Sequence, residues 1–301
     1  MATKWKGKTR GGKFGYQFFI YLIKHLGVKT AYTFLAFIVI HFIPFAPKAT
    51  ASSWFYSRKI LKQNIFKSTI FLFKSYYRFG QILIDKVAIG YGLEKKYKFK
   101  FENYEKFLEI LNDDKGAVIV GAHVGNWEIG APFFDDYGKK MNIVLYDAEH
   151  RRIKEVLEKN KAFADYKVIA VNNDSLEHIF NIKTALDNKE YVCFQGDRYV
   201  TQDKLLACSF MGKVAKFPAG LFLLASRLKV PVIFYFAMRE PHKTYRFYFY
   251  MAEPFGRKAG IKPEQELLEQ YVQALESILK KYPEQWFNYY KFWESDSKHN
   301  G

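Results

Sequence analysis

The chain has 301 residues, of which 49% are hydrophobic, and a formal net charge of +17 at pH 7. This length and apolar content allow a sizeable core, which excludes an intrinsically disordered protein. The two cysteines, Cys193 and Cys208, have neither metal-ligand nor redox-motif spacing, so the sequence requires no oxidising compartment and indicates no metal site.

The positive charge is concentrated near the N-terminus. The first acidic residue is Asp85, and 14 basic residues precede it, whereas the rest of the chain holds 33 basic and 30 acidic residues. The basic residues alternate with apolar runs such as YQFFIYLI (16–23) and IFLF (70–73). Basic, polar arms favour nucleic acid, but basic and strongly apolar segments favour an anionic membrane surface. We therefore expect residues 1–90 to form a helical, membrane-associating segment, and we expect no nucleic-acid partner.

Residues 30–46 carry no formal charge apart from any on His41. About 17 apolar residues is the lower limit for a membrane-spanning helix. The basic region before them is too long for the leading part of a cleaved signal peptide. The pattern predicts an uncleaved anchor that either spans the membrane or lies in its interface, with the basic flank on the cytoplasmic side. One or two amphipathic helices are expected over residues 54–89.

From about residue 100, apolar runs alternate with helical patterns. The expected helices are 101–111, one from about 126, 149–161, 175–188, 217–228 and 263–281, and the expected strands are 117–120, 142–147, 167–171, 191–195, 230–238 and 245–254. Wholly apolar strands alternating with helices predict an α/β domain, here residues 91–301, with a mainly parallel sheet sandwiched by helices.

The stretch AVIVGAHVGNWEIG (117–130) places His123 just after a buried strand. In parallel sheets, chemistry tends to lie at the carboxyl ends of the strands. His123 and Glu128 can meet only if His123 lies in the loop and Glu128 in the first helical turn, because residues five apart on one helix point about 140° away from each other. Glu128 would then hold one imidazole nitrogen while the other accepts a proton from a hydroxyl, and free N–H groups of the helix start would form an oxyanion site. The alternative is a structural histidine beside a capped helix start.

The string GAHVGNWE closely resembles the histidine–four residues–acid motif of the lysophospholipid acyltransferase superfamily. More narrowly, it resembles the His–x–Gly–Asn–Trp–Glu motif of the lipid A biosynthesis (late, secondary) acyltransferases of Gram-negative bacteria. Further similar motifs follow in the same order: GDR (196–198), KFPAGLFLLASRLKVPVIFYF (216–236) and YPEQWF (282–287). With the N-terminal anchor, the resemblance covers nearly the entire chain.

The resemblance implies a glycerolipid acyltransferase-like fold at the cytoplasmic face of the cell inner membrane. The implied reaction moves a fatty acyl group from a carrier thioester to a lipid hydroxyl, and it requires neither a cofactor nor a metal. His123 would be the general base and Glu128 its orienting partner. The residues expected to bind substrate are Gly125, Asn126, Asp197, Arg198 and Arg151.

These substrate-binding residues have different expected roles. Arg198 would hold a phosphate or another polar headgroup, and Asp197 would fix its loop; the alternative is a strand-end turn with a surface ion pair. Arg151 belongs to a basic cluster that would contact the donor or simply form a solvated helix face. The aromatic residues of the C-terminal tail are expected to pack or to lie at an interface: Trp286, Phe287, Tyr289 and Tyr290.

Several alternatives stay open. Better-known family members carry a His–Arg–Arg cluster after Pro–Glu–Gln, whereas this chain has the single Lys291, so the acceptor is either a lipid A precursor or another amphiphile such as a phospholipid, aminolipid or pigment. The positive surface favours acyl carrier protein over coenzyme A as the donor. A thioesterase would need a nucleophile such as Ser209 or Cys208, which lack a motif. A non-enzymatic basic membrane-binding protein would leave GAHVGNWE unexplained.

Overall fold

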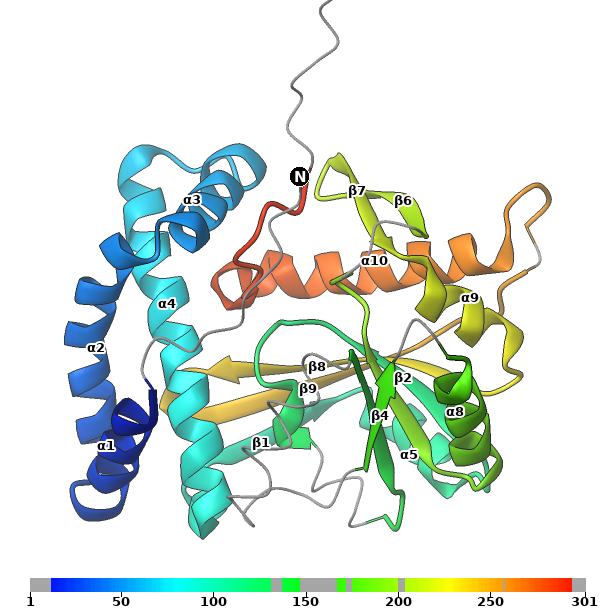
Figure 1. The fold of residues 1–301 in the computed structure, drawn as a ribbon, viewed down its shortest axis with the longest axis horizontal. Coiled ribbons are helices and arrows are strands. Elements are labelled where there is room, and N and C mark those ends of the chain that lie inside the picture. The colour runs from blue at the N-terminus through cyan, green and yellow to red at the C-terminus, as the bar shows by residue number, and fades with distance from the viewer. Residues whose placement is uncertain are drawn as a thin grey trace, which may run out of the picture. The chain divides into compact units, whose positions relative to one another are not determined.

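The computed structural model describes residues 12–130, 137–146, 167–171, 175–199, 204–256 and 258–293 (Figure 1). The chain divides into two compact units that meet between Tyr97 and Lys98. This boundary lies close to the predicted division at residue 90. The N-terminal unit and the α/β unit, as we call residues 98–301 below, are described separately.

The N-terminal unit is helical, as expected. Its elements are α1 (Gly12–His25), α2 (Gly27–Phe45), α3 (Pro47–Phe55), the π-helical turn η1 (Tyr56–Ile60), α4 (Ile65–Ala88) and the turns η2 (Ile89–Leu93) and η3 (Glu94–Lys96). Helices α2 and α4 pack side by side (Figure 1). The buried Asp85 carboxylate of α4 accepts hydrogen bonds from the hydroxyls of Tyr32 on α2 and of Tyr97, which ties the helices together.

Helix α2 is long and apolar enough to cross a membrane, and only 22% of its apolar stretch is buried. Its outer side exposes large apolar side chains, among them Phe37 and Ile40, which are 69% and 63% exposed. A helix that leaves such side chains to solvent lacks a protein partner for them within the described chain. This surface is consistent with membrane association.

The α/β unit is built on a seven-stranded sheet in the order β1-β9-β8-β2-β5-β3-β4. Its strands are β1 (Lys98–Glu102), β2 (Ala117–Gly121), β3 (Met141–Tyr146), β4 (Lys167–Val171), β5 (Tyr191–Gln195), β8 (Val232–Glu240) and β9 (Thr244–Met251). Neighbouring strands are parallel except for β8 and β9. Strand β2 is buried along its whole length, as its apolar sequence requires. The predicted α/β fold with a mainly parallel sheet is confirmed.

Helices cover both faces of this sheet (Figure 1). They are α5 (Tyr104–Asn112), α8 (Glu177–Asp187), α9 (Ala219–Arg227) and α10 (Pro263–Lys281), with the short 3-10 turns η4 (Trp127–Gly130), η5 (Pro241–Lys243) and η6 (Pro283–Gln285). Alternate residues of β8 show the two faces. Phe234 packs against Tyr271 of α10, whereas Tyr235 packs against Phe249, which stacks on Phe107 of α5.

The structure differs from the predicted elements in three places. Strand β1 precedes α5, so the helix expected over residues 101–111 begins only at Tyr104; the alternating lysines and phenylalanines of β1 are a half-exposed strand pattern. A hairpin of β6 (Leu205–Phe210) and β7 (Lys213–Pro218) was not predicted. The helix expected from about residue 126 is the short turn η4 as far as the described residues show, and the helix expected over 149–161 lies outside them.

Candidate active site

His123 lies in the loop after β2, as predicted, and faces a carboxylate from the neighbouring strand. In the β2–β5 register Gly121 pairs with Gln195, so His123 and Asp197 each stand two residues beyond the last pair. The His123 Nδ1 and the Asp197 Oδ1 atoms are 2.8 Å apart. The His123 side chain is 23% exposed, whereas that of Asp197 is fully buried. The imidazole is therefore held at Nδ1 by a buried carboxylate, while part of its ring stays accessible to solvent.

Asp197 is held as an ionised carboxylate. Its two oxygens accept the backbone N–H of His123, each at 3.0 Å, and Oδ2 also accepts the indole N–H of Trp286 at 3.0 Å. Burial alone would raise the pKa of Asp197, but neighbouring His123, the charge of Arg198 and the Trp286 hydrogen bond outweigh burial and hold this pKa below its usual range. Because a carboxylate only accepts hydrogen bonds, the proton between the two side chains belongs on His123 Nδ1.

The C-terminal segment 285–290 forms hydrogen bonds with the backbone around His123 and Asp197. The Gly125 N–H donates to the Gln285 carbonyl at 3.0 Å, and the Phe287 N–H donates to the His123 carbonyl at 2.9 Å. The Tyr290 hydroxyl donates to the backbone carbonyl of Asp197 at 3.0 Å, and burial raises the pKa of Tyr290, which keeps this donor protonated. The segment thus fixes the backbone on both sides of the His123–Asp197 pair.

The residues after His123 are used differently from the prediction. Glu128 was expected to bond one imidazole nitrogen, but Asp197 is the carboxylate that bonds Nδ1. Glu128 itself lies half-buried in η4. The N–H groups of Gly125 and Asn126 are not free for an oxyanion, because they donate to the carbonyls of Gln285 and Ala237. The loop comes so close to β8 that a Cβ atom on Gly125, at φ +54°, would lie 2.0 Å from the Ala237 oxygen.

Asn126 keeps one unused donor. Its side chain is buried, 4% exposed, and within the described part of the chain its Nδ2 atom has no hydrogen-bond partner. A buried amide donor without a partner is costly unless a ligand or water satisfies it. The contact of Asn126 with substrate stays a prediction.

The two predicted arginines have separate outcomes. Arg198 is half-buried and its Nη2 atom donates to the Phe287 carbonyl at 2.9 Å, so it holds the C-terminal segment, and its role toward a headgroup stays a prediction. Asp197 is fully buried and accepts the backbone N–H of His123, and its predicted role in substrate binding stays a prediction. Arg151 lies outside the described residues.

Sequence reasoning missed the parts played by Trp286 and Tyr290, which were expected only to pack or to lie at an interface. It also missed Tyr271 of α10, whose buried hydroxyl donates to the Gly121 carbonyl at the end of β2 at 2.9 Å. The available signal was the motif YPEQWF itself, because a tryptophan N–H that is buried needs an acceptor. Nothing in the sequence indicates that this acceptor is Asp197.

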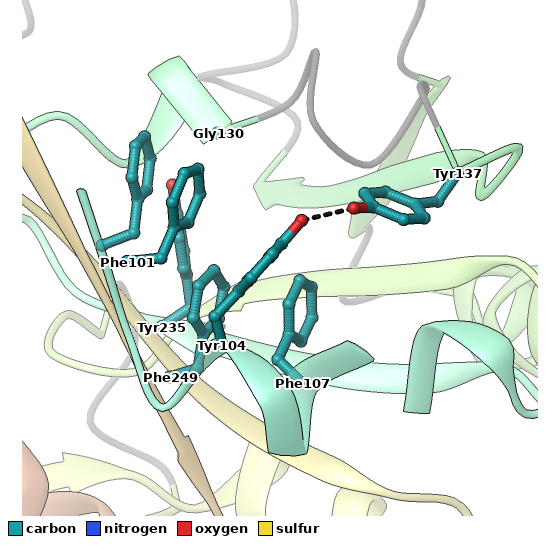
Figure 2. A pocket seen from close by; sticks show the side chains of 8 residues that line it. Phe101, Tyr104, Phe107, Gly130, Tyr137, Tyr235 and Phe249 are labelled. Carbon is teal, nitrogen blue, oxygen red and sulfur yellow. Dashed lines mark hydrogen bonds between the residues drawn. The ribbon is translucent and has the colours of Figure 1, made fainter. Parts of the chain in front are cut away.

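An aromatic pocket lies beside the same loop (Figure 2). The free space that it encloses is small, about 10 Å³, which is room for about one water molecule. Figure 2 shows the Tyr104 and Tyr137 hydroxyls hydrogen-bonded to each other across it. Apart from Gly130, the last residue of η4, its lining is aromatic: Phe101, Tyr104, Phe107, Tyr137, Tyr235, Phe247 and Phe249. The turn that follows His123 therefore ends against a cluster of aromatic side chains.

Comparison with known proteins identifies the family. The sequence model described as "Bacterial lipid A biosynthesis acyltransferase" matches residues 71–295. Among solved structures, the crystal structure of the 1-acyl-sn-glycerophosphate acyltransferase PlsC from Thermotoga maritima is similar at 14% sequence identity and a TM-score of 0.36, covering 79% of this chain and 96% of that chain. No curated protein matches the chain. The match over most of the sequence shows that the chain is an acyltransferase and belongs to the bacterial lipid A biosynthesis acyltransferase family.

Proposed function

We propose that this enzyme transfers a fatty acyl group from an acyl thioester to a hydroxyl of a membrane lipid, with His123 as the general base. The observation that carries this proposal is an imidazole whose Nδ1 is bonded to a buried carboxylate while the side chain stays 23% exposed. In such a pair, Nε2 is the nitrogen left to accept a proton.

The reaction needs one proton taken and one returned. Nε2 of His123 accepts the proton of the acceptor hydroxyl as its oxygen attacks the thioester carbonyl. The new C–O bond forms, the C–S bond breaks, and the departing thiolate receives the proton from the imidazolium. General base catalysis of this kind contributes about 10²–10⁴-fold in rate. We propose the Asn126 Nδ2 group as a donor to the carbonyl oxygen, since Asn126 follows His123 by three residues and this group has no partner among the described residues.

The aromatic side chains of Figure 2 offer an acyl chain an apolar surface, although they enclose only about 10 Å³ of free space as they stand. The pocket lining carries no charged side chain, and Gly130 joins it to the loop of His123. Small-molecule sites are usually concave and largely apolar, with a few polar groups to fix orientation. We propose that these side chains move apart to admit the part of the acyl chain nearest the carbonyl, with the thioester at His123.

We propose a lipid A precursor as the acceptor and acyl carrier protein as the donor. The family supports the former, and the net charge of +17 would attract an acidic carrier. One observation favours a different amphiphile as a second candidate acceptor. Where better-known members carry a basic cluster, this chain places Tyr290 against Asp197 and buries Phe292, leaving the exposed Lys291 as the basic residue.

We also place the enzyme at the cytoplasmic face of the cell inner membrane, held by the N-terminal unit. Helix α2 has the length and composition of a spanning segment, and the residues before Asp85 carry basic charge without acids. Extraction separates this from a basic nucleic-acid binder, because an anchored protein should need detergent whereas a nucleic-acid binder should be released by high salt.

A hydrolase is less well supported than a transferase. Of the two candidate nucleophiles, Ser209 and Cys208, the Cys208 thiol has its pKa raised to about 11, mainly by burial, so it is protonated at neutral pH and poorly nucleophilic. Cys193 is fully buried, and burial likewise raises its pKa. Neither thiol suits covalent catalysis.

The test uses the full chain in detergent micelles. Acyl-acyl carrier protein and acyl coenzyme A are each offered with a lipid A precursor, a lysophospholipid and water alone, and products are identified by mass spectrometry. We expect an acylated lipid with wild type, none above background with His123→Ala, and wild-type activity with the matched control His178→Ala on α8. Transfer by His123→Ala within threefold of wild type would refute the general base, and release of free fatty acid without lipid product would favour the thioesterase.

A further inference from the structure

The buried carboxylate below His123 has a complete set of partners. Asp197 Oδ1 receives the His123 Nδ1–H at 2.8 Å and the His123 backbone N–H at 3.0 Å, and Oδ2 receives the same N–H and the Trp286 Nε1–H at 3.0 Å. These bonds leave the carboxylate one orientation. A carboxylate fixed in this way fixes the imidazole that donates to it.

The support beneath this pair is rigid. The Gly121 carbonyl, at the end of β2, accepts both the Gly196 N–H and the Tyr271 hydroxyl, each at 2.9 Å. A Cβ on Gly196 would lie 2.7 Å from the Tyr271 ring, so the loop carrying Asp197 is pressed against α10. The ends of β2 and β5, which carry His123 and Asp197, are therefore bonded to each other and packed against helix α10.

We infer that Asp197, and not Glu128, is the carboxylate that positions His123: it holds the Nδ1–H tautomer, aims Nε2 at the acceptor hydroxyl and stabilises the imidazolium. This inference rests on the proposed function. Asp197 is a positioning residue, because it is fully buried and acts through the imidazole. A buried carboxylate in this role need not itself become protonated.

Other titratable groups lie around the His123–Asp197 pair, and a pH experiment must distinguish their titration from that of the pair. Arg198 contributes positive charge near Asp197, and Tyr271 and Tyr290 lie close enough to interact with it electrostatically. Burial raises the pKa of both tyrosines, so they do not titrate near neutrality. Glu128, in η4 on the same loop as His123, is the remaining carboxylate to test.

The first measurement compares pH profiles of kcat/KM for full-length Asp197→Asn and Glu128→Gln, both close in shape to the native side chain. Asp197→Asn should lower kcat/KM by about 10²–10⁴-fold and shift the acid limb of the profile toward lower pH by about one unit, because the imidazolium loses its stabilising charge. Glu128→Gln should leave that limb in place. A limb that moves with Glu128→Gln and stays with Asp197→Asn would overturn the inference.

A second variant works even if Asp197→Asn fails to fold. Trp286→Phe removes one donor from Oδ2 while keeping an aromatic ring against Phe210 and Phe292. The less satisfied carboxylate should stabilise the imidazolium more strongly, so the acid limb should move toward higher pH, opposite to Asp197→Asn. An unchanged limb in Trp286→Phe would contradict the pairing, since a merely structural residue changes the amount of active enzyme and not the limb.

A readout independent of turnover separates this inference from the proposed function. In ¹⁵N-histidine-labelled wild type, with His123→Ala to assign the signal, the ring should be protonated at Nδ1 and not at Nε2 above the acid limb, and Trp286→Phe should perturb that signal. The expected tautomer without acyl transfer would reject the function and keep the pairing. Acyl transfer with an Nε2–H tautomer would keep the function and overturn the pairing.

Discussion

Replacing Gly125 with alanine should separate the loop of His123 from the sheet that supports it. Gly125 has φ +54°, and its added Cβ would lie 2.0 Å from the Ala237 oxygen, 2.9 Å from the Ala237 carbonyl carbon and 3.0 Å from the Met238 sulfur. Two costs combine: a left-handed backbone costs a non-glycine residue about 1–2 kcal/mol, and forcing an extra carbon into a packed site costs about 1–3 kcal/mol. We expect a loss of about 3 kcal/mol in the free energy of unfolding.

The chain supplies a matched control for this change. Gly212, at the tip of the β6–β7 hairpin, has φ +79° and open space where its Cβ would stand. Gly212→Ala should therefore incur only the backbone cost of about 1–2 kcal/mol. Since about 1 kcal/mol shifts Tm by roughly 2–4 °C in a unit of this size, Gly125→Ala should lower Tm by about 6–12 °C and Gly212→Ala by about half as much or less.

Thermal unfolding and acyl transfer are measured on the same detergent-solubilised samples. Below the Tm of both variants, Gly212→Ala should keep wild-type turnover, whereas Gly125→Ala should lose it, because relief of the clash moves Asn126 off the Ala237 carbonyl and displaces His123. Equal Tm shifts for the two variants would show that the close approach to Ala237 is not part of the folded enzyme. A destabilised Gly125→Ala with full kcat would show that the loop position does not matter to catalysis.

Three further predictions follow from other parts of the molecule. Because the pKa of Asp197 is lowered in the folded state, its ionised carboxylate stabilises the fold above the unfolded carboxyl pKa of about 3.9, and this stabilisation is lost as pH falls through the folded pKa. Tm of wild type should therefore fall more steeply from about pH 5 downward than Tm of Asp197→Asn. Phe37→Asp, near the middle of α2, should cost about 3 kcal/mol if α2 spans the membrane and markedly less if it lies in the interface, as measured by the fraction retained after carbonate washing; unchanged retention would argue against spanning. Tyr271→Phe should cost about 1 kcal/mol and no more, because the Gly121 carbonyl keeps the Gly196 N–H as a donor; a loss above about 3 kcal/mol in denaturant unfolding would mean that the hydroxyl has a larger role.

Most strands of the sheet could be predicted because they are short, wholly apolar runs in the sequence. Strand β2 is a run of apolar residues, and it is buried on both faces, as such runs in parallel sheets are. Strand β1 escaped because its lysines alternate with phenylalanines at the sheet edge and merge in sequence with the helical pattern of α5. The β6–β7 hairpin escaped because Met211 and Gly212 form its turn without the usual asparagine or aspartate before the glycine.

Half of the candidate site could be predicted as well. His123 was placed at a strand end because an apolar run stops there, and the structure agrees. Sequence distance favours Glu128, five residues away, as its carboxylate partner. The partner at Nδ1 instead comes from 74 residues away, because β5 pairs directly with β2 while β3 and β4 lie beyond it. Strand order is a tertiary property, and local spacing carries no information about it.

The same topology explains why the C-terminal motif belongs to the site although its side chains are buried. Trp286 reaches Asp197 across 89 residues of sequence, and the backbone on either side of Trp286 pairs with that on either side of Val124. Each of the three segments alone would leave a polar group buried without a partner: the carboxylate of Asp197, the indole N–H of Trp286 or the backbone N–H of Gly125. Because an unsatisfied buried group costs about 1–3 kcal/mol, and more if charged, the segments stabilise one another only when all three are in place. The imidazole orientation is therefore a consequence of the closed fold, and residues that never meet the substrate help to determine it.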